Sequence, residues 1–290
     1  CHSHQSATDQ TQVIEAKAQQ VTERLTHPTV GQKRSLGLDE VKLNTKPRPV
    51  AIDRNFNARV DDIFKNQYLS PRPQTTTLQI PVQGIGEWCH PKFTVEINDS
   101  LFRLLSVKGR RRIFGIDYLT PRQGNNILFA SLWDNYPDSV SISIRPTKAR
   151  TASILLAGST NHMQTRIANA VIYADYEDGT RDSLLLIPPF NYCPIEQDYF
   201  VDGKAFSLTT EASQSYERPL RVSLSTDVVS SNIGDDMGIP PTEVYGRLLD
   251  GGAAQILNMP LDDKKKVFRL TMRCLSNDIV VGIMAVTLLR

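Results

Sequence analysis

Two β-rich segments joined by an Asp-Gly turn give the strongest indication of how this chain folds. Residues 170–176 (AVIYADY) and 181–187 (RDSLLLI) are rich in β-branched, aromatic and aliphatic residues, and Asp178-Gly179 lies between them. Such a pair between two strand-like segments predicts a β-hairpin, because glycine readily adopts the positive φ that a tight turn needs. We therefore expect antiparallel pairing in this part of the chain.

Further short segments of this kind follow residue 70. They are apolar or alternate in polarity, and Gly, Pro, Asn and Asp residues separate them. They cover residues 75–82, 92–97, 126–133, 139–144, 153–157, 220–224, 254–257, 267–275 and 279–289. Helical periodicity is scarce and strands do not alternate with helices, which argues against a parallel α/β sheet. The sequence predicts an all-β fold, a jelly-roll-like antiparallel β-sandwich.

The first 73 residues are different in character. Residues 11–25 carry apolar side chains at helical spacing, and His27-Pro28 ends this pattern. We expect three regions: a partly disordered tether with one short amphipathic helix at 1–45, a linker with a short helix at 57–66 within 46–73, and the β-sandwich domain at 74–290.

The chain begins with Cys1, followed by a polar stretch. A bacterial lipoprotein has this pattern once its signal peptide is removed and the cysteine carries lipid; an arbitrary chain boundary is the alternative. No segment reaches the roughly 18 apolar residues that a membrane span needs. We expect a lipid anchor on Cys1 and a location in the bacterial cell envelope, as an outer-membrane lipoprotein on either the periplasmic or the surface face.

Charge and cysteine content argue against two kinds of partner. The chain has 33 Lys and Arg residues against 31 Asp and Glu residues, a formal net charge of +2. Nucleic-acid-binding proteins usually show a concentrated basic excess, so we expect no nucleic acid partner. The basic clusters at 108–112 and 264–266 are predicted to be solvated strand connections. The four cysteines lie far apart in the sequence, which predicts no metal centre. We expect no cofactor, with a structural calcium ion on loop oxygens as the alternative.

Residues 191–203 (NYCPIEQDYFVDG) combine several carboxylates with aromatic residues. Glycoside hydrolysis needs two carboxyl groups roughly 5–10 Å apart. In an extended segment Glu196 and Asp198 would lie on one face, about 7 Å apart, and Asp134 is a further weak candidate. The alternative is that these carboxylates accept hydrogen bonds from backbone N–H groups of an irregular loop.

Two clusters have the mixture of aromatic and hydrogen-bonding side chains that suits a sugar. Trp133, Asp134 and Asn135 lie at the end of a predicted strand, and Tyr192, Gln197 and Tyr199 lie in the carboxylate-rich segment. An exposed ring would serve as a platform for a sugar, whereas burial of Trp133 in the sandwich core is the alternative.

Five segments recur in the order of a known family. They are 83–91 (QGIGEWCHP), 132–139 (LWDNYPDS), 156–161 (LAGSTN), 193–203 (CPIEQDYFVDG) and 275–283 (LSNDIVVGI). Together they resemble the C-terminal part of a family of large secreted Bacteroidetes proteins, a domain of unknown function often encoded among polysaccharide-degradation genes. The resemblance covers roughly residues 74–290. It implies a β-sandwich accessory region, found in longer relatives beside a six-hairpin glycosidase-like region for which this chain has no room. Tyr192 stands where the family pattern has Trp.

These observations favour a non-catalytic extracytoplasmic lipoprotein. It would bind a glycan, or act as an accessory subunit of an outer-membrane protein complex for polysaccharide uptake or degradation. A glycoside hydrolase with a carboxylate pair and a purely structural docking subunit are the two alternatives.

Overall fold

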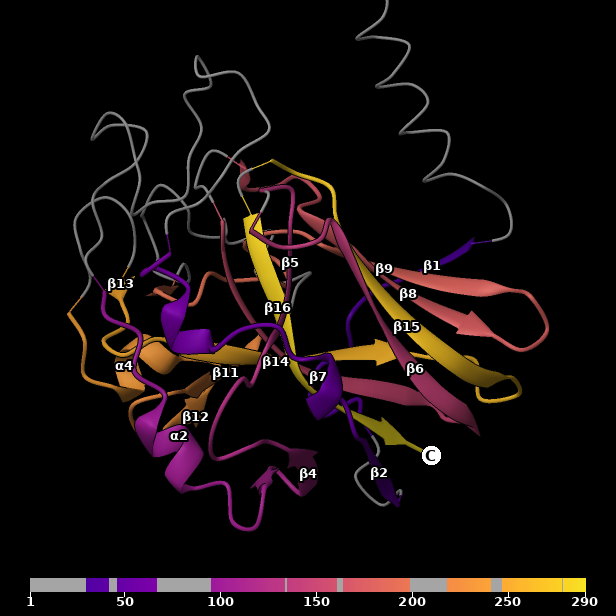
Figure 1. Ribbon diagram of the computed structural model, residues 1–290, viewed down its shortest axis with the longest axis horizontal. Helices are drawn as coiled ribbons and strands as arrows, with labels where there is room; N and C mark the ends of the chain where they lie inside the picture. The colour runs from indigo at the N-terminus through magenta and orange to yellow at the C-terminus, as the bar shows by residue number, and fades with distance from the viewer. Residues whose placement is uncertain are drawn as a thin grey trace, which may run out of the picture.

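The computed structural model describes residues 30–41, 46–66, 95–133, 135–160, 164–198, 218–240, 247–277 and 279–290. Within these ranges the protein is an all-β sandwich whose two large sheets pack against each other, as the sequence predicts (Figure 1). Consecutive strands repeatedly cross between the sheets, from β6 to β7, β7 to β8, β14 to β15 and β15 to β16, which is the jelly-roll-like feature of the fold.

The first sheet has five strands in the order β1-β9-β8-β15-β6. Their bounds are β1 Val30–Lys33, β6 Ser139–Lys148, β8 Ala170–Tyr176, β9 Arg181–Leu186 and β15 Lys266–Cys274. The predicted hairpin is confirmed as β8–β9, and Gly179 in its turn has a φ of +82°. All pairs are antiparallel except β1, which runs parallel to β9 at the sheet edge.

The second sheet has seven strands. Six follow the order β12-β11-β14-β7-β16-β2, and β5 pairs with β16 beside them. Their bounds are β2 Pro47–Val50, β5 Leu128–Ser131, β7 Thr151–Thr160, β11 Leu220–Ser223, β12 Val229–Ser230, β14 Ala253–Pro260 and β16 Ile279–Leu289. Most of these strands overlap segments that are predicted as strands from their apolar composition.

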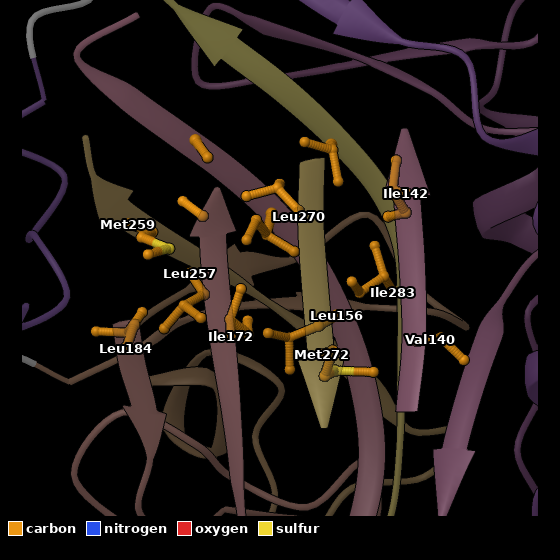
Figure 2. Close-up of a cluster of buried hydrophobic side chains, with 14 of the residues drawn as sticks. Val140, Ile142, Leu156, Ile172, Leu184, Leu257, Met259, Leu270, Met272 and Ile283 are labelled. Carbon is orange, nitrogen blue, oxygen red and sulfur yellow. The ribbon is translucent and has the colours of Figure 1, made fainter. Parts of the chain in front are cut away.

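The main core lies between the two sheets. In β6, residues alternate between exposed and buried, so that Val140, Ile142 and Ile144 point inward. Burying each such side chain contributes roughly 1.5–3 kcal/mol. Figure 2 shows the side chains of Val140 and Ile142 beside those of other strands. Among the latter, the labelled residues are Leu156, Ile172, Leu184, Leu257, Met259, Leu270, Met272 and Ile283.

The seven-stranded sheet is buried on both faces. Every residue of β7 and β16 is buried, which explains why the sequence of β16 is almost continuously apolar. A third layer covers the outer face, and it contains α2 (Ser100–Leu104), the hairpin of β3 (Arg110–Ile113) and β4 (Ile116–Leu119), and the 3₁₀ turn η2 (Val60–Asp62). Tyr118 of this layer lies 2.7 Å, hydroxyl to hydroxyl, from Ser153 of β7.

Several segments differ from the expected organisation. Residues 47–50, expected in a linker, form β2 and pair with Val286–Leu289 of β16, and β1 lies within the expected tether. Apolar side chains at Ala58, Val60 and Ile63 pack into the third layer without a long helix, since only the short turns η1 (Asp53–Asn55) and η2 form there.

The basic cluster at 108–112 leads into strand β3 rather than forming only a loop, because Arg111 and Ile113 turn inward while Arg110 and Arg112 face outward. Of the cluster at 264–266, Lys264 and Lys265 lie in the connection between β14 and β15 as predicted, and Lys266 is the first residue of β15. The helix expected at 11–25 and the strand expected at 75–82 lie outside the described residues. Within the described ranges, no helix is long and apolar enough to cross a membrane.

Candidate functional site

Residues 191–198, the described part of the carboxylate-rich segment, form a buried loop that crosses the ends of two strands of the second sheet. The N–H of Ile195 donates to the carbonyl of Gly158 on β7 at 2.7 Å, and the N–H of Ala253 on β14 donates to the carbonyl of Ile195 at 2.8 Å. The loop ends in β10 (Gln197–Asp198), which pairs with β13 (Arg247–Leu248). Its backbone is therefore fixed to the sheet, and its polar side chains meet an interior rather than a cleft.

Glu196 is enclosed, with 1 % of its surface exposed. Its Oε1 accepts a hydrogen bond of 2.9 Å from the Ser159 hydroxyl on β7, and its Oε2 is buried with no hydrogen-bond partner among the described residues. Burial raises the pKa of this carboxyl to about 7, against the lowering effects of hydrogen bonds and of the Arg221 charge. A group so enclosed cannot reach a substrate in this structure.

Arg221 is the cation that holds the loop. Its guanidinium is buried and donates to backbone carbonyls on two sides, those of the loop and those of β14. The donor–acceptor distances are 2.8 Å to Pro194, 2.9 Å to Gln197, 3.1 Å to Ala253 and 3.4 Å to Ala254. The planar fork of a guanidinium suits such a set of acceptors, so Arg221 binds loop and strand together.

Asp198 has a separate partner. Its Oδ2 accepts a hydrogen bond of 3.2 Å from the N–H of Gly234 in α4 (Ile233–Asp236). Glu196 and Asp198 are thus both buried and bonded to different elements. The arrangement fits the alternative that these carboxylates hold backbone and side-chain donors in place, and it does not provide the open carboxylate pair that hydrolysis requires.

The predicted aromatic platforms are also buried, which corrects the expectation for these residues. Trp133 is 4 % exposed within the third layer, and Tyr192 is fully buried in the core between the sheets. Gln197 is fully buried and Asn135 is half-buried. Burying a large aromatic side chain in the core of a sandwich stabilises the fold more than leaving it exposed in a loop. Neither ring therefore offers a face to a sugar.

Three predicted site residues, Cys1, Asp134 and Tyr199, lie outside the described part of the chain, as does Cys89. Of the remaining cysteines, Cys193 and Cys274 are free thiols, and burial raises the pKa of each to about 12. Across the described ranges, no three His, Cys, Asp or Glu side chains gather in a way that would hold a metal ion.

A groove with a volume of about 1390 Å³ lies beside the buried loop. The segment after β1 forms one wall, the ends of β11 and β12 form the other, and Ile256 and Asn258 of β14 lie in the floor. Leu36 bridges to Asn258, which fixes the first wall against the sheet. Phe190 and Asn191, at the start of the carboxylate-rich segment, also line this groove.

Charged and amide side chains lie along the groove walls. Arg34 donates to both carboxylate oxygens of Glu40, at 2.5 and 2.9 Å, and this pairing holds the pKa of Glu40 down at about 2. On the opposite wall Arg218 donates to the side-chain oxygen of Asn232 at 2.6 Å. The sequence carries no local signal for this set, because its members come from segments that lie far apart along the chain.

No protein-family model matches this chain, and no curated protein matches its sequence. The likeness to secreted polysaccharide-degradation proteins therefore rests on the five sequence segments and stays a prediction.

Proposed function

We propose that this protein is a non-catalytic accessory protein of the bacterial cell envelope that binds a glycan chain in the groove between residues 32–40 and 218–232. The observation that supports this role most directly is the groove itself. Its two walls present guanidinium, amide and hydroxyl groups, and leucine, isoleucine and phenylalanine side chains lie between them. A lipid on Cys1 and a place in an outer-membrane polysaccharide assembly belong to the same proposal and rest on the sequence.

The chemistry of the walls suits a sugar polymer. A pyranose ring offers hydroxyl groups around its edge and apolar C–H faces above and below. Arg34, Arg218 and Asn232 provide donors and acceptors for hydroxyl groups, and the half-buried ring of Phe190 provides an apolar surface. The groove volume of about 1390 Å³ exceeds the roughly 300–1,000 Å³ of small-molecule pockets, which favours a chain of several sugar units.

Binding is favoured over hydrolysis by the position of the carboxylates. Glu196 and Asp198 are buried and bonded to different elements. Within the groove, Glu40 is paired to Arg34 and has a lowered pKa, so it is unsuited to donate a proton to a leaving group near neutral pH.

The test is affinity gel electrophoresis of the full chain in gels that contain soluble polysaccharides. A Ser231→Trp variant fills the groove wall and should migrate without retardation, whereas wild type is retarded. Ser143→Trp is the matched control, because Ser143 is exposed on β6 away from the groove, and it should bind like wild type.

Three results would contradict the proposal. The first is equal retardation of wild type and Ser231→Trp. The second is release of reducing ends from the polysaccharide by purified protein, which would favour a hydrolase. The third is an absence of glycan binding together with stable co-purification of a partner from native membranes, which would favour a docking subunit.

A further inference from the structure

Exposed apolar side chains gather in one small region of the described surface. Five large apolar residues are strongly exposed in the described ranges, and four of them lie between residues 104 and 114. They are Leu104, Leu105, Val107 and Phe114, with exposed fractions of 61, 38, 67 and 48 %. They come from the end of α2, the turn after it and the tip of the β3–β4 hairpin, which lie together at the lower edge of Figure 1.

Two non-glycine residues of this region have a positive φ, a backbone conformation that glycine or asparagine would adopt at lower cost. Phe114 has a φ of +46° and Gly115 a φ of +80°, so the two form the tight turn between β3 and β4. A bulky residue pays a free-energy cost in the left-handed region, which glycine and asparagine adopt readily. Lys108, with a φ of +51°, repeats this before Gly109. Residues in such conformations cluster at functional sites, which makes the exposed Phe114 a candidate for a contact.

Cations alternate with the apolar side chains. Arg110 and Arg112 face outward on β3 and Phe114 is exposed in the turn that follows, while Arg111 turns inward over the ring of Phe102. Arg112 lies 4.0 Å from Asp117, and Lys108 and Arg110 form no ion pair with any residue that the structure describes. Two acids, Asp117 and Asp227, border a hollow of about 620 Å³ beside this face. Asp227 is exposed and Asp117 is half-buried, so the exposed cations Lys108, Arg110 and Arg112 outnumber the acids beside them.

We infer that this surface binds an anionic lipid surface. We call it the hairpin patch, and it comprises Leu104, Leu105, Val107, Lys108, Arg110, Arg112 and Phe114. Separate protruding apolar side chains, with cations at the same level, match the boundary between acyl chains and anionic headgroups. A membrane accepts such chains without the matching pockets that a protein partner must supply. The inference does not rest on glycan binding, although Phe114 also borders the groove.

The test is flotation of the full chain with Cys1 replaced by serine, so that no lipid can be attached. Vesicles of phosphatidylcholine are compared with vesicles that also contain phosphatidylglycerol. The protein should float with the anionic vesicles and lose binding as salt rises, because salt screens exposed charges. Replacing both Arg110 and Arg112 by Gln should weaken partitioning roughly 30-fold, from two cations near the surface.

Two further variants separate binding from folding. Phe114→Asn relieves the left-handed strain, so it should raise the melting temperature while it weakens vesicle binding. Val107→Ser removes an apolar side chain that does not line the glycan groove, and it should also weaken binding. Ile167→Asn removes the fifth exposed apolar residue, and replacing Arg145 and Lys148 by Gln removes two cations elsewhere on the surface. Both controls should bind like wild type.

The inference is overturned if the protein ignores anionic vesicles, or if the hairpin-patch variants and the controls bind them equally. Capture of an acidic soluble protein by the hairpin patch, without vesicle binding, would likewise replace the lipid surface by a protein partner. Glycan retardation of the Val107→Ser variant stays normal in each case, so failure here is distinguishable from failure of the groove proposal.

Discussion

Replacing Glu196 by Gln should change how the stability of this protein depends on pH. In the folded protein the pKa of Glu196 is about 7, whereas the ordinary value is 4.5. The Glu196 carboxyl thus binds its proton more tightly in the folded state than in the unfolded state. Folding is therefore coupled to uptake of a proton at pH values between 4.5 and about 7. The wild-type free energy of unfolding therefore falls as pH rises from about 4.5 to about 7. The difference of 2.5 between these two pKa values corresponds to about 3 kcal/mol.

The glutamine side chain would keep an oxygen for the Ser159 hydroxyl but has no charge to desolvate. The variant should lack this pH dependence. The free energy of unfolding of the variant minus that of wild type should therefore rise by about 3 kcal/mol as pH increases from about 4.5 to about 8. Urea unfolding at 25 °C across this range measures the difference. Glu96→Gln is the control, since Glu96 is exposed, and its curve should stay parallel to wild type.

Parallel pH curves for wild type and Glu196→Gln would refute the reasoning. They would mean that Glu196 is hydrated or paired with a cation in solution, and that the loop is less enclosed than the structure shows. The comparison also bears on function, because a carboxylate that titrates freely would again be a candidate for catalysis.

Three other substitutions test the same interior and the first sheet. Gly158→Ala should destabilise the protein by about 1–3 kcal/mol or more in urea unfolding, because a Cβ there would clash with the backbone oxygen of Val280 and lie 2.7 Å from the Tyr192 hydroxyl. Arg221→Lys should cost about 3 kcal/mol or more, since an ammonium group cannot serve four buried carbonyls. For Asp175, burial alone would raise the pKa, but Arg181 and Arg269 outweigh it and hold the pKa below its usual value. The stability that this carboxylate contributes is present above the ordinary pKa of 3.8 and is lost as pH falls below it. Asp175→Asn should therefore flatten the acid side of the stability profile, measured by thermal unfolding.

Most of the strand framework could be predicted from the sequence. The segments at 139–144, 153–157 and 279–289 are apolar or alternate over a strand length and end at turn residues, and each lies within an observed strand. Asp178-Gly179 located the hairpin because glycine meets the φ requirement of the turn locally. These sequence patterns depend on only a few neighbouring residues, so they predict strands and turns without knowledge of the tertiary fold.

The third layer and the groove could not be predicted in this way. Pro47–Val50 has the composition of a linker, and it is a strand only because the edge of β16 offers it hydrogen bonds. The pair Glu196 and Asp198 has catalytic spacing, but whether such carboxylates face a cleft or an interior depends on Ser159 and Gly234, which are distant in sequence. The groove residues Arg34 and Asn232 converge for the same reason.

The buried loop and the groove share a structural support, the side chain of Gln255. Gln255 of β14 lies beneath both: its side-chain oxygen accepts the N–H of Cys193 at 2.8 Å, and its side-chain nitrogen donates to the carbonyl of Asn191 at 2.7 Å. Asn191 in turn lines the groove. The hydrogen bonds of Gln255 therefore fix the backbone of the loop at the point where it borders the groove. A buried network costs free energy wherever it is incompletely satisfied, and under the proposed function this cost would be offset by the rigid surface that the network gives the groove.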